Sequence, residues 1–101
     1  MIIYSVTVSV EDAVHDDWFD WMRNIHIPDV IKTGYFSGWQ IRELIDPAPQ
    51  DRTKTYNIQY EMADMDAYLT YQRHHAKALQ ADHQNRYGER VVAFRTLLKD
   101  V

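Results

Sequence analysis

Residues 2–10 read IIYSVTVSV, and from Tyr4 to Val10 apolar side chains alternate one by one with hydroxyl side chains. This period of two is typical of a β-strand that has one buried face and one polar face. We therefore predict that the chain opens with a strand whose apolar face contributes to a core. The residues that follow decide which other elements cover that face.

Three later stretches predict further strands. Residues 35–45 and 53–62 alternate in the same way, and residues 91–98, VVAFRTLL, are typical of a final strand. The segment between the two alternating stretches, residues 46–51, reads DPAPQD. Its prolines exclude a regular ladder of hydrogen bonds, so we expect a turn or loop there.

Helical spacing separates the first strand from the second. Apolar side chains recur every three or four residues from Val14 to Ile25, which predicts an amphipathic helix. Pro28 interrupts this pattern, because proline is accepted in the first turn of a helix and not in its interior. We predict a short second helical piece over residues 28–33, with Gly34 as its left-handed stop.

A longer helix separates the third strand from the fourth. Asp64 is a favourable N-cap, and the helical pattern then runs to about Tyr87, where Gly88 follows as a stop. This length is unusual for a globular helix and predicts a bend over residues 76–81. The element order is β-α-β-β-α-β. It predicts one ferredoxin-like α+β domain over residues 1–101, with a four-stranded antiparallel sheet and helices on one face.

The composition narrows the classes of function. The chain has 101 residues, a formal net charge of -4 and no Cys. The acidic balance argues against binding to nucleic-acid phosphates, and the lack of Cys excludes disulfides and cysteine metal sites. The first residues lack the basic start and apolar core of a signal peptide, and no apolar run has the length of a membrane span. We expect a cytoplasmic protein that binds neither membranes nor nucleic acid.

The two faces of the predicted sheet differ in character. We assign the apolar strand residues, with Val92, Phe94 and Leu98 among them, to the side that faces the helices. The opposite face collects polar side chains with few charges, and it is either solvated or covered by a second copy of the chain across a twofold axis. The candidates for such a dimer interface are Gln40, Arg42, Asn57, Gln59, Glu61 and Arg95.

Four segments carry a resemblance to a known family: IIYSVTV (2–8), HIPDVIKTGYF (26–36), YNIQYE (56–61) and QADHQNRYGERVVAFRTLL (80–98). Together they resemble a family of short bacterial proteins known only as a domain of unknown function, which is similar in element order to the dimeric α+β barrel superfamily. The resemblance implies a homodimer in which two four-stranded sheets pack face to face with the helices outside. It implies no reaction and no catalytic residue, because members of the superfamily differ widely in function.

Histidine and aromatic side chains are candidates for a ligand pocket between sheet and helices. His26 lies where the first helix is interrupted, and Asp29 is placed to orient its ring. Tyrosines on the strands form an aromatic wall that either fills the core or lines a wet cavity for a planar ligand. The candidate pocket residues are His26, Trp39, Tyr56, Tyr60, Tyr68 and His75.

These features favour a small, soluble homodimer without established activity that binds a small apolar or aromatic ligand between sheet and helices. Two alternatives stay open. One is a cofactor-independent monooxygenase or isomerase of the dimeric α+β barrel type, in which His26 and a tyrosine transfer protons. The other is a haem-binding protein with His26 or His75 as the axial ligand.

The remaining histidines do not predict a metal site. His74 and His75 point about 100° apart around a helix, and His75 lies about 12 Å from His83 along its axis. The sequence also lacks the spacing of a Ser-His-Asp triad and a glycine-rich phosphate loop. We expect no metal and no cofactor, and the catalytic residues, if the protein is an enzyme, are unknown.

Overall fold

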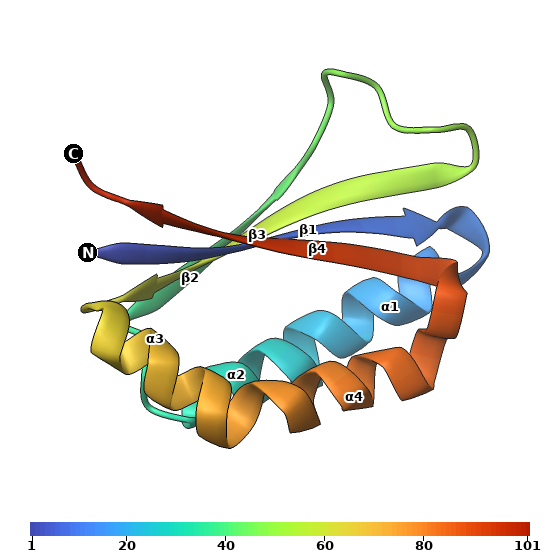
Figure 1. The fold of residues 1–101 in the computed structure, drawn as a ribbon. Helices are drawn as coiled ribbons and strands as arrows, with labels where there is room; N and C mark the ends of the chain where they lie inside the picture. Colours follow the sequence, from blue (N-terminus) through green and yellow to red (C-terminus); the bar gives the residue numbers. More distant parts are fainter.

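Four antiparallel strands form one sheet in the order β2-β3-β1-β4 in the computed structural model, which describes residues 1–101 (Figure 1). The strands are β1 (Ile2–Glu11), β2 (Gly38–Glu43), β3 (Thr53–Met62) and β4 (Val91–Lys99). The two most regularly alternating strands, β1 and β3, lie at the centre and pair with each other over their whole length. This arrangement confirms the ferredoxin-like α+β fold, although β2 is shorter than the alternation predicts.

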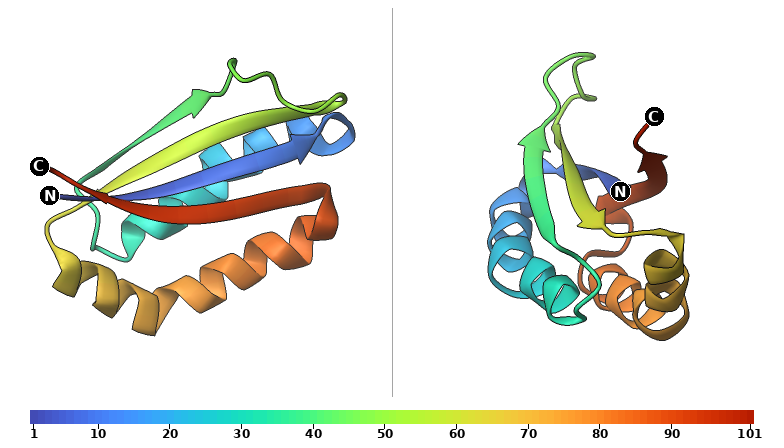
Figure 2. Two further views of the ribbon diagram at one scale, coloured as in Figure 1. Left: turned by 45° about the horizontal axis from the view of Figure 1, so that its top comes forward. Right: turned by 90° about the vertical axis from the view of Figure 1, so that its left-hand side faces the viewer.

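Two helical arms cover one face of the sheet (Figure 2). The first arm consists of η1 (Asp12–Val14), α1 (His15–Trp21), η2 (Met22–His26) and α2 (Ile27–Lys32). The second consists of α3 (Met65–Tyr71), η3 (Gln72–Ala76), α4 (Lys77–Tyr87) and η4 (Gly88–Arg90). The other face of the sheet is uncovered, and the loop between β2 and β3 projects away from the helices (Figure 1). None of the helices combines the length and the hydropathy that a membrane span needs.

The ends of the helical arms follow the signals in the sequence. The side chain of Asp64 accepts a hydrogen bond from the backbone N–H of Ala67 at 2.9 Å, which makes it the N-cap of α3. Gly34 after α2 and Gly88 after α4 have positive φ angles of 88° and 57°. Glycine adopts such angles without the steric cost of a Cβ atom, so the two predicted helix stops are confirmed.

Each helical arm contains one wide turn of π-helix, η2 in the first arm and η3 in the second. At the end of η2 the backbone N–H of Ile27 donates to the carbonyl of Met22, five residues earlier, and α2 continues directly from it. The helix therefore widens before Pro28 and does not end there, because the first turn of α2 tolerates the missing N–H of proline. In the second arm, η3 lies just before the region for which the sequence predicts a bend.

The core lies between the sheet and the two arms. Trp18 of α1 and Ile27 of α2 are 0% and 1% exposed, and they belong to one apolar cluster with Val8 of β1 and Ile58 of β3. This cluster fixes both arms against the central strands, so residues from both arms and from the sheet come together beneath the same apolar face.

The prediction of which β4 side chains face the helices was wrong, because the alternation of the strand is offset by one residue. The register pairs Arg95 with Val6 of β1, and paired residues in antiparallel strands point to the same face of the sheet. Arg95 therefore lies on the side of the helices. The bulkier apolar side chains of β4 fall on the uncovered face instead: Val92, Phe94 and Leu98, which are 62%, 61% and 47% exposed. The prediction followed the hydropathy of β4 alone, whereas pairing with β1 decides which way its side chains point.

Candidate functional site

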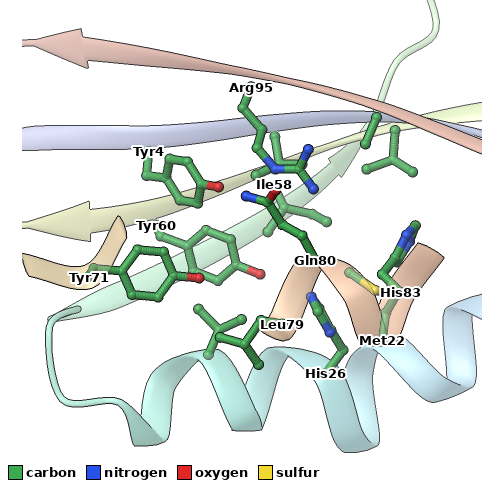
Figure 3. Close-up of a pocket in the computed structure, with 14 residues that line it drawn as sticks. Tyr4, Met22, His26, Ile58, Tyr60, Tyr71, Leu79, Gln80, His83 and Arg95 are labelled. Atoms are coloured by element: carbon green, nitrogen blue, oxygen red, sulfur yellow. The ribbon is translucent and has the colours of Figure 1, made fainter. Parts of the chain in front are cut away.

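A small cavity lies between the sheet and the helical arms, with a volume of about 30 Å³. This is room for about two atoms of the size of a water molecule. Apolar side chains make up most of its wall, and polar groups from both layers converge on it (Figure 3). The residues that carry these polar groups are Tyr4, His26, Tyr60, Tyr71, Gln80, His83 and Arg95.

Two buried tyrosines point their hydroxyl groups into the cavity (Figure 3). Tyr60 of β3 and Tyr71 at the end of α3 are each 2% exposed, and neither hydroxyl makes a hydrogen bond to another protein group. Neither oxygen is sealed within the packed core, since no fully enclosed side-chain atom lacks a partner. Burial raises the pKa of both phenols above its ordinary value, so both remain hydrogen-bond donors.

Tyr4 of β1 joins these two tyrosines in one aromatic layer. Its ring centroid lies 6.0 Å from that of Tyr60 and 5.9 Å from that of Tyr71. Burial raises the pKa of Tyr4, and the nearby Arg95 guanidinium and Gln80 amide oppose that shift. The packed rings supply the apolar area of the layer, and their hydroxyls form its polar edge.

Two histidines face the cavity from the helical arms. His26 is the last residue of the wide turn η2, and His83 belongs to α4, with their ring centroids 5.8 Å apart. Burial lowers the pKa of each imidazole to about 4, and the charge of Arg95 contributes to the same shift. The negative charge of Asp29 acts in the opposite direction and raises the pKa of His26. Both rings are therefore neutral at pH 7.

Trp18 fixes the protonation pattern of His83. The indole Nε1–H donates to His83 Nε2 at 3.0 Å, so this nitrogen must carry a lone pair. The proton of the neutral ring then lies on Nδ1. Protonation of Nε2 would abolish the hydrogen bond and place a charge in an apolar environment, which agrees with the lowered pKa.

An open groove between α4 and β4 leads to the cavity. Its volume is about 330 Å³, and its lining consists of Lys77, Gln80, Ala81, His83, Gln84, Val91, Ala93 and Arg95. Gln80, His83, Ala93 and Arg95 also line the cavity. These shared residues form the boundary between the groove and the cavity.

The structure places two of the predicted pocket residues, His26 and Tyr60, in the wall of the cavity. Trp39 lies on β2 opposite Tyr60 but is 37% exposed and outside that wall. Tyr56 also lies elsewhere, because its hydroxyl forms a 2.7 Å hydrogen bond with Nε2 of His15 at the start of α1.

Tyr68 and His75, the other two predicted pocket residues, lie behind the cavity wall in the second arm. The ring of Tyr68 packs 5.9 Å from that of Tyr4, and its hydroxyl accepts a hydrogen bond from Gln72. His75 packs between Tyr35 and Tyr71, at 5.6 Å and 6.2 Å between ring centroids. These side chains support the aromatic layer, and the cavity lies on its other side.

Several polar residues that line the cavity were not among those predicted from the sequence. Gln80 and His83 are three residues apart on α4, a spacing that places both on the inner face of a helix and is a signal for their shared role. Arg95 carried a weaker signal, a lone cation in the otherwise apolar run VVAFRTLL. Tyr71 gave no signal that separates it from the other tyrosines of its helix.

The predicted interface residues divide between the two faces of the sheet. The register places five of them on the uncovered face: Gln40, Arg42, Asn57, Gln59 and Glu61. There the Asn57 side-chain amide donates to Ser5 Oγ at 2.9 Å and to Thr7 Oγ1 at 3.2 Å. Arg95 is the exception, since it faces the helices and the cavity.

The lowered histidine pKa values predict a loss of stability in mild acid. In the unfolded chain His83 titrates near 6.5, and in the folded protein it titrates near 4. The unfolded state then binds more protons between these values, so the free energy of unfolding decreases as the pH falls from 6.5 to 4. Urea unfolding measured across this range should show the decrease. His83→Gln should reduce the decrease in the free energy of unfolding, whereas His74→Gln, at an exposed histidine, should leave it unchanged. If the free energy of unfolding depends on pH equally in the original chain and in both variants, His83 is not the source of the decrease.

Comparison with solved structures identifies similar folds at low sequence identity. An ethyl tert-butyl ether D (EthD) family protein from Bacillus halodurans has a TM-score of 0.69 at 11% identity, with all of both chains covered. HapK from Hahella chejuensis has a TM-score of 0.66 at 11% identity, with 100% of this chain and 93% of that chain covered. A dimeric ferredoxin-like protein from an uncultured marine organism has a TM-score of 0.53 at 12% identity, with coverages of 99% and 98%.

At these identities the similarity establishes the fold and nothing about activity. No curated protein sequence matches the chain. One family model matches over its whole length, residues 1–101, as the resemblance of the four sequence segments implied. The chain therefore belongs to the family described as Domain of unknown function (DUF4286).

Proposed function

We propose that the protein is a homodimer in which each subunit binds a small ligand, with an apolar or aromatic body, between the sheet and the helical arms. The observation that carries the proposal is the pair of buried hydroxyls of Tyr60 and Tyr71. They have no protein partner and face a cavity that adjoins an open groove. Both oxygens remain accessible from the cavity, so a ligand atom or a water molecule there can serve as their hydrogen-bond acceptor.

The volumes decide how such a ligand would lie. The cavity of about 30 Å³ cannot hold an aromatic ring, whereas the groove of about 330 Å³ can. The ring would therefore lie in the groove between α4 and β4, and a polar end would reach between Gln80 and Arg95 to the tyrosines. The same volumes give no support to haem, and His75, one of its two candidate axial ligands, lies outside the cavity wall.

The binding proposal predicts a response to small aromatic compounds. Benzyl alcohol, benzamide and benzoate are titrated separately against the protein, and amide NMR signals are followed. At least one compound should shift the signals of Gln80, His83 and Ala93, which line the groove. Ala93→Phe fills the shared wall and should weaken that binding by about tenfold or more. Ala78→Phe, at an exposed position of α4, is the matched control. Absence of any shift with all three compounds would refute the proposal.

The homodimer is supported by the uncovered face of the sheet. Val92, Phe94 and Leu98 expose an apolar stripe along β4 there, beside the polar side chains of β1 and β3. A soluble domain rarely leaves such a stripe open, and a second copy placed across a twofold axis covers it with the same residues. One protein of the same fold is itself described as dimeric.

The dimer proposal predicts that one charge on the apolar stripe separates the subunits. Phe94→Asp would bury an unpaired carboxylate at the interface, which should weaken association by on the order of a hundredfold. Sedimentation at micromolar concentration should show a dimer for the original chain and a monomer for this variant. Leu69→Asp removes a comparably exposed apolar side chain on α3 and should remain dimeric. A monomeric original chain would exclude the dimer.

An isomerase is the second candidate function, and it is favoured by the placement of an imidazole, His26, in the same cavity wall as the hydroxyls of Tyr60 and Tyr71. A neutral imidazole accepts a proton, and Tyr60, Tyr71 and Arg95 donate hydrogen bonds to an oxyanion that forms beside it. Isomerisation of a carbonyl compound needs only these two groups. In an unsaturated ketone a proton leaves the carbon between the carbonyl and the double bond, the dienolate oxygen is stabilised, and the proton returns to the far end of the conjugated system, so that the double bond moves.

Hydrogen exchange tests this second candidate directly. With 2-indanone in D₂O, the protein should accelerate replacement of the hydrogens beside the carbonyl by deuterium, measured by proton NMR against buffer. His26→Gln should return the rate to the buffer value, while His74→Gln should have no effect. Exchange at the buffer rate in the presence of excess protein would exclude this chemistry for ring ketones and leave the binding proposal in place.

A further inference from the structure

Arg95 is a cation on the apolar side of the sheet without an anionic partner. The ion pairs of the protein are those of Met1 with Asp100, His15 with Asp16, and Arg86 with Asp17. None of them involves Arg95. The Arg95 side chain is exposed and lines the open groove between α4 and β4, so its charge is hydrated and accessible to a ligand that enters the groove.

The absence of acids around Arg95 contrasts with the rest of the molecule. The chain has 15 acidic residues against 11 basic ones, yet neither the cavity nor the groove has an Asp or Glu in its lining. Lys77 adds a second cation to the groove. Asp29 acts on His26 from outside the lining. Cavity and groove therefore form a positively charged pocket in an acidic protein.

Three of the polar groups around the cavity are hydrogen-bond donors that lack a carboxylate partner. Arg95 presents guanidinium N–H groups from β4, and the hydroxyls of Tyr60 and Tyr71 point toward the same space (Figure 3). A guanidinium and a carboxylate have matching planar geometry, and charge-assisted hydrogen bonds are the strong ones. The cavity, of about 30 Å³, is small, which favours a compact anionic head such as a carboxylate.

We propose that the ligand of this site is a small aromatic or apolar carboxylic acid, whose carboxylate occupies the cavity between Arg95 and the hydroxyls of Tyr60 and Tyr71. Its body lies in the groove between α4 and β4, beside Lys77. The proposal rests on the binding function proposed above and adds the charge and orientation of the ligand. It also gives the two unpartnered hydroxyls an acceptor and the guanidinium a counter-ion.

Compounds of the same shape but different charge test whether the site prefers a carboxylate. Benzoate and benzamide have the same shape and differ in charge, and phenyl phosphate carries a larger anion. By NMR titration, benzoate should bind at least about tenfold more tightly than benzamide and than phenyl phosphate. The advantage over benzamide should shrink as salt is added. Equal affinity for benzoate and benzamide would overturn the inference, although binding of both in the groove would still support the binding function. Tighter binding of phenyl phosphate would also overturn it.

Variants assign the effect to particular side chains. Arg95→Gln should remove most of the preference for benzoate over benzamide, and Arg95→Lys should retain part of it. Arg73→Gln, which removes an exposed charge on η3, is the control and should leave the preference intact. Tyr60→Phe and Tyr71→Phe should each weaken benzoate by about threefold to tenfold and leave benzamide closer to its original affinity. A preference that survives Arg95→Gln unchanged would refute the site.

Folding and binding failures are distinguishable. Each variant is first compared with the original chain by thermal unfolding, and if Arg95→Gln is unfolded, the comparison of benzoate with benzamide in the original chain decides alone. If none of the compounds shifts the groove signals, the binding function itself fails. If the compounds bind without regard to charge, only the inference about the carboxylate fails.

Discussion

The pairing of β1 with both of its neighbours is the constraint on which the rest of the structure depends. Paired residues of antiparallel strands point to the same face of the sheet. Val6 of β1 pairs with Ile58 of β3 and with Arg95 of β4, so all three side chains lie on the side of the helices. The same register leaves Phe94 on the opposite side. A single alignment of strands therefore determines the positions of both Arg95, the cation of the proposed ligand site, and the apolar stripe of the proposed dimer interface. A shift of one residue would exchange the two.

Tyrosine explains how a polar cavity forms inside such a small core. A phenol has an apolar ring with one polar atom at its tip. The rings of Tyr4, Tyr60 and Tyr71 pack against one another, and this places three hydroxyls along one side of the layer (Figure 3). The cavity lies where these tips meet the helical arms. The aromatic rings thus fill the core, and their hydroxyl ends line the cavity. Both interpretations of the aromatic wall, as core packing and as a cavity lining, apply to these tyrosines.

The wide turn η2 connects the backbone of the first arm to the chemistry of the cavity. His26 is its last residue, and its ring stacks 4.9 Å from that of Trp21 at the end of α1. Insertions of π-helix are common at functional sites, because the extra residue redirects a side chain without ending the helix. Here Pro28 follows two residues later and is compatible with the turn, since α2 starts beside it. The result is a neutral histidine held at a defined position in the cavity wall.

Alternation, helical spacing and caps are local properties, and they were sufficient to predict the element order, the ferredoxin-like sheet and the stops at Gly34 and Gly88. The predicted pocket residues His26 and Tyr60 lie in the cavity wall, where a helix interruption and a strand face, both recognisable from neighbours in the chain, place them. The orientation of Arg95 was predicted wrongly, since the hydropathy of β4 favours the opposite orientation of that strand. Only the hydrogen-bonded register with β1 decides it, and a register joins residues far apart in sequence whose pairing no local pattern records.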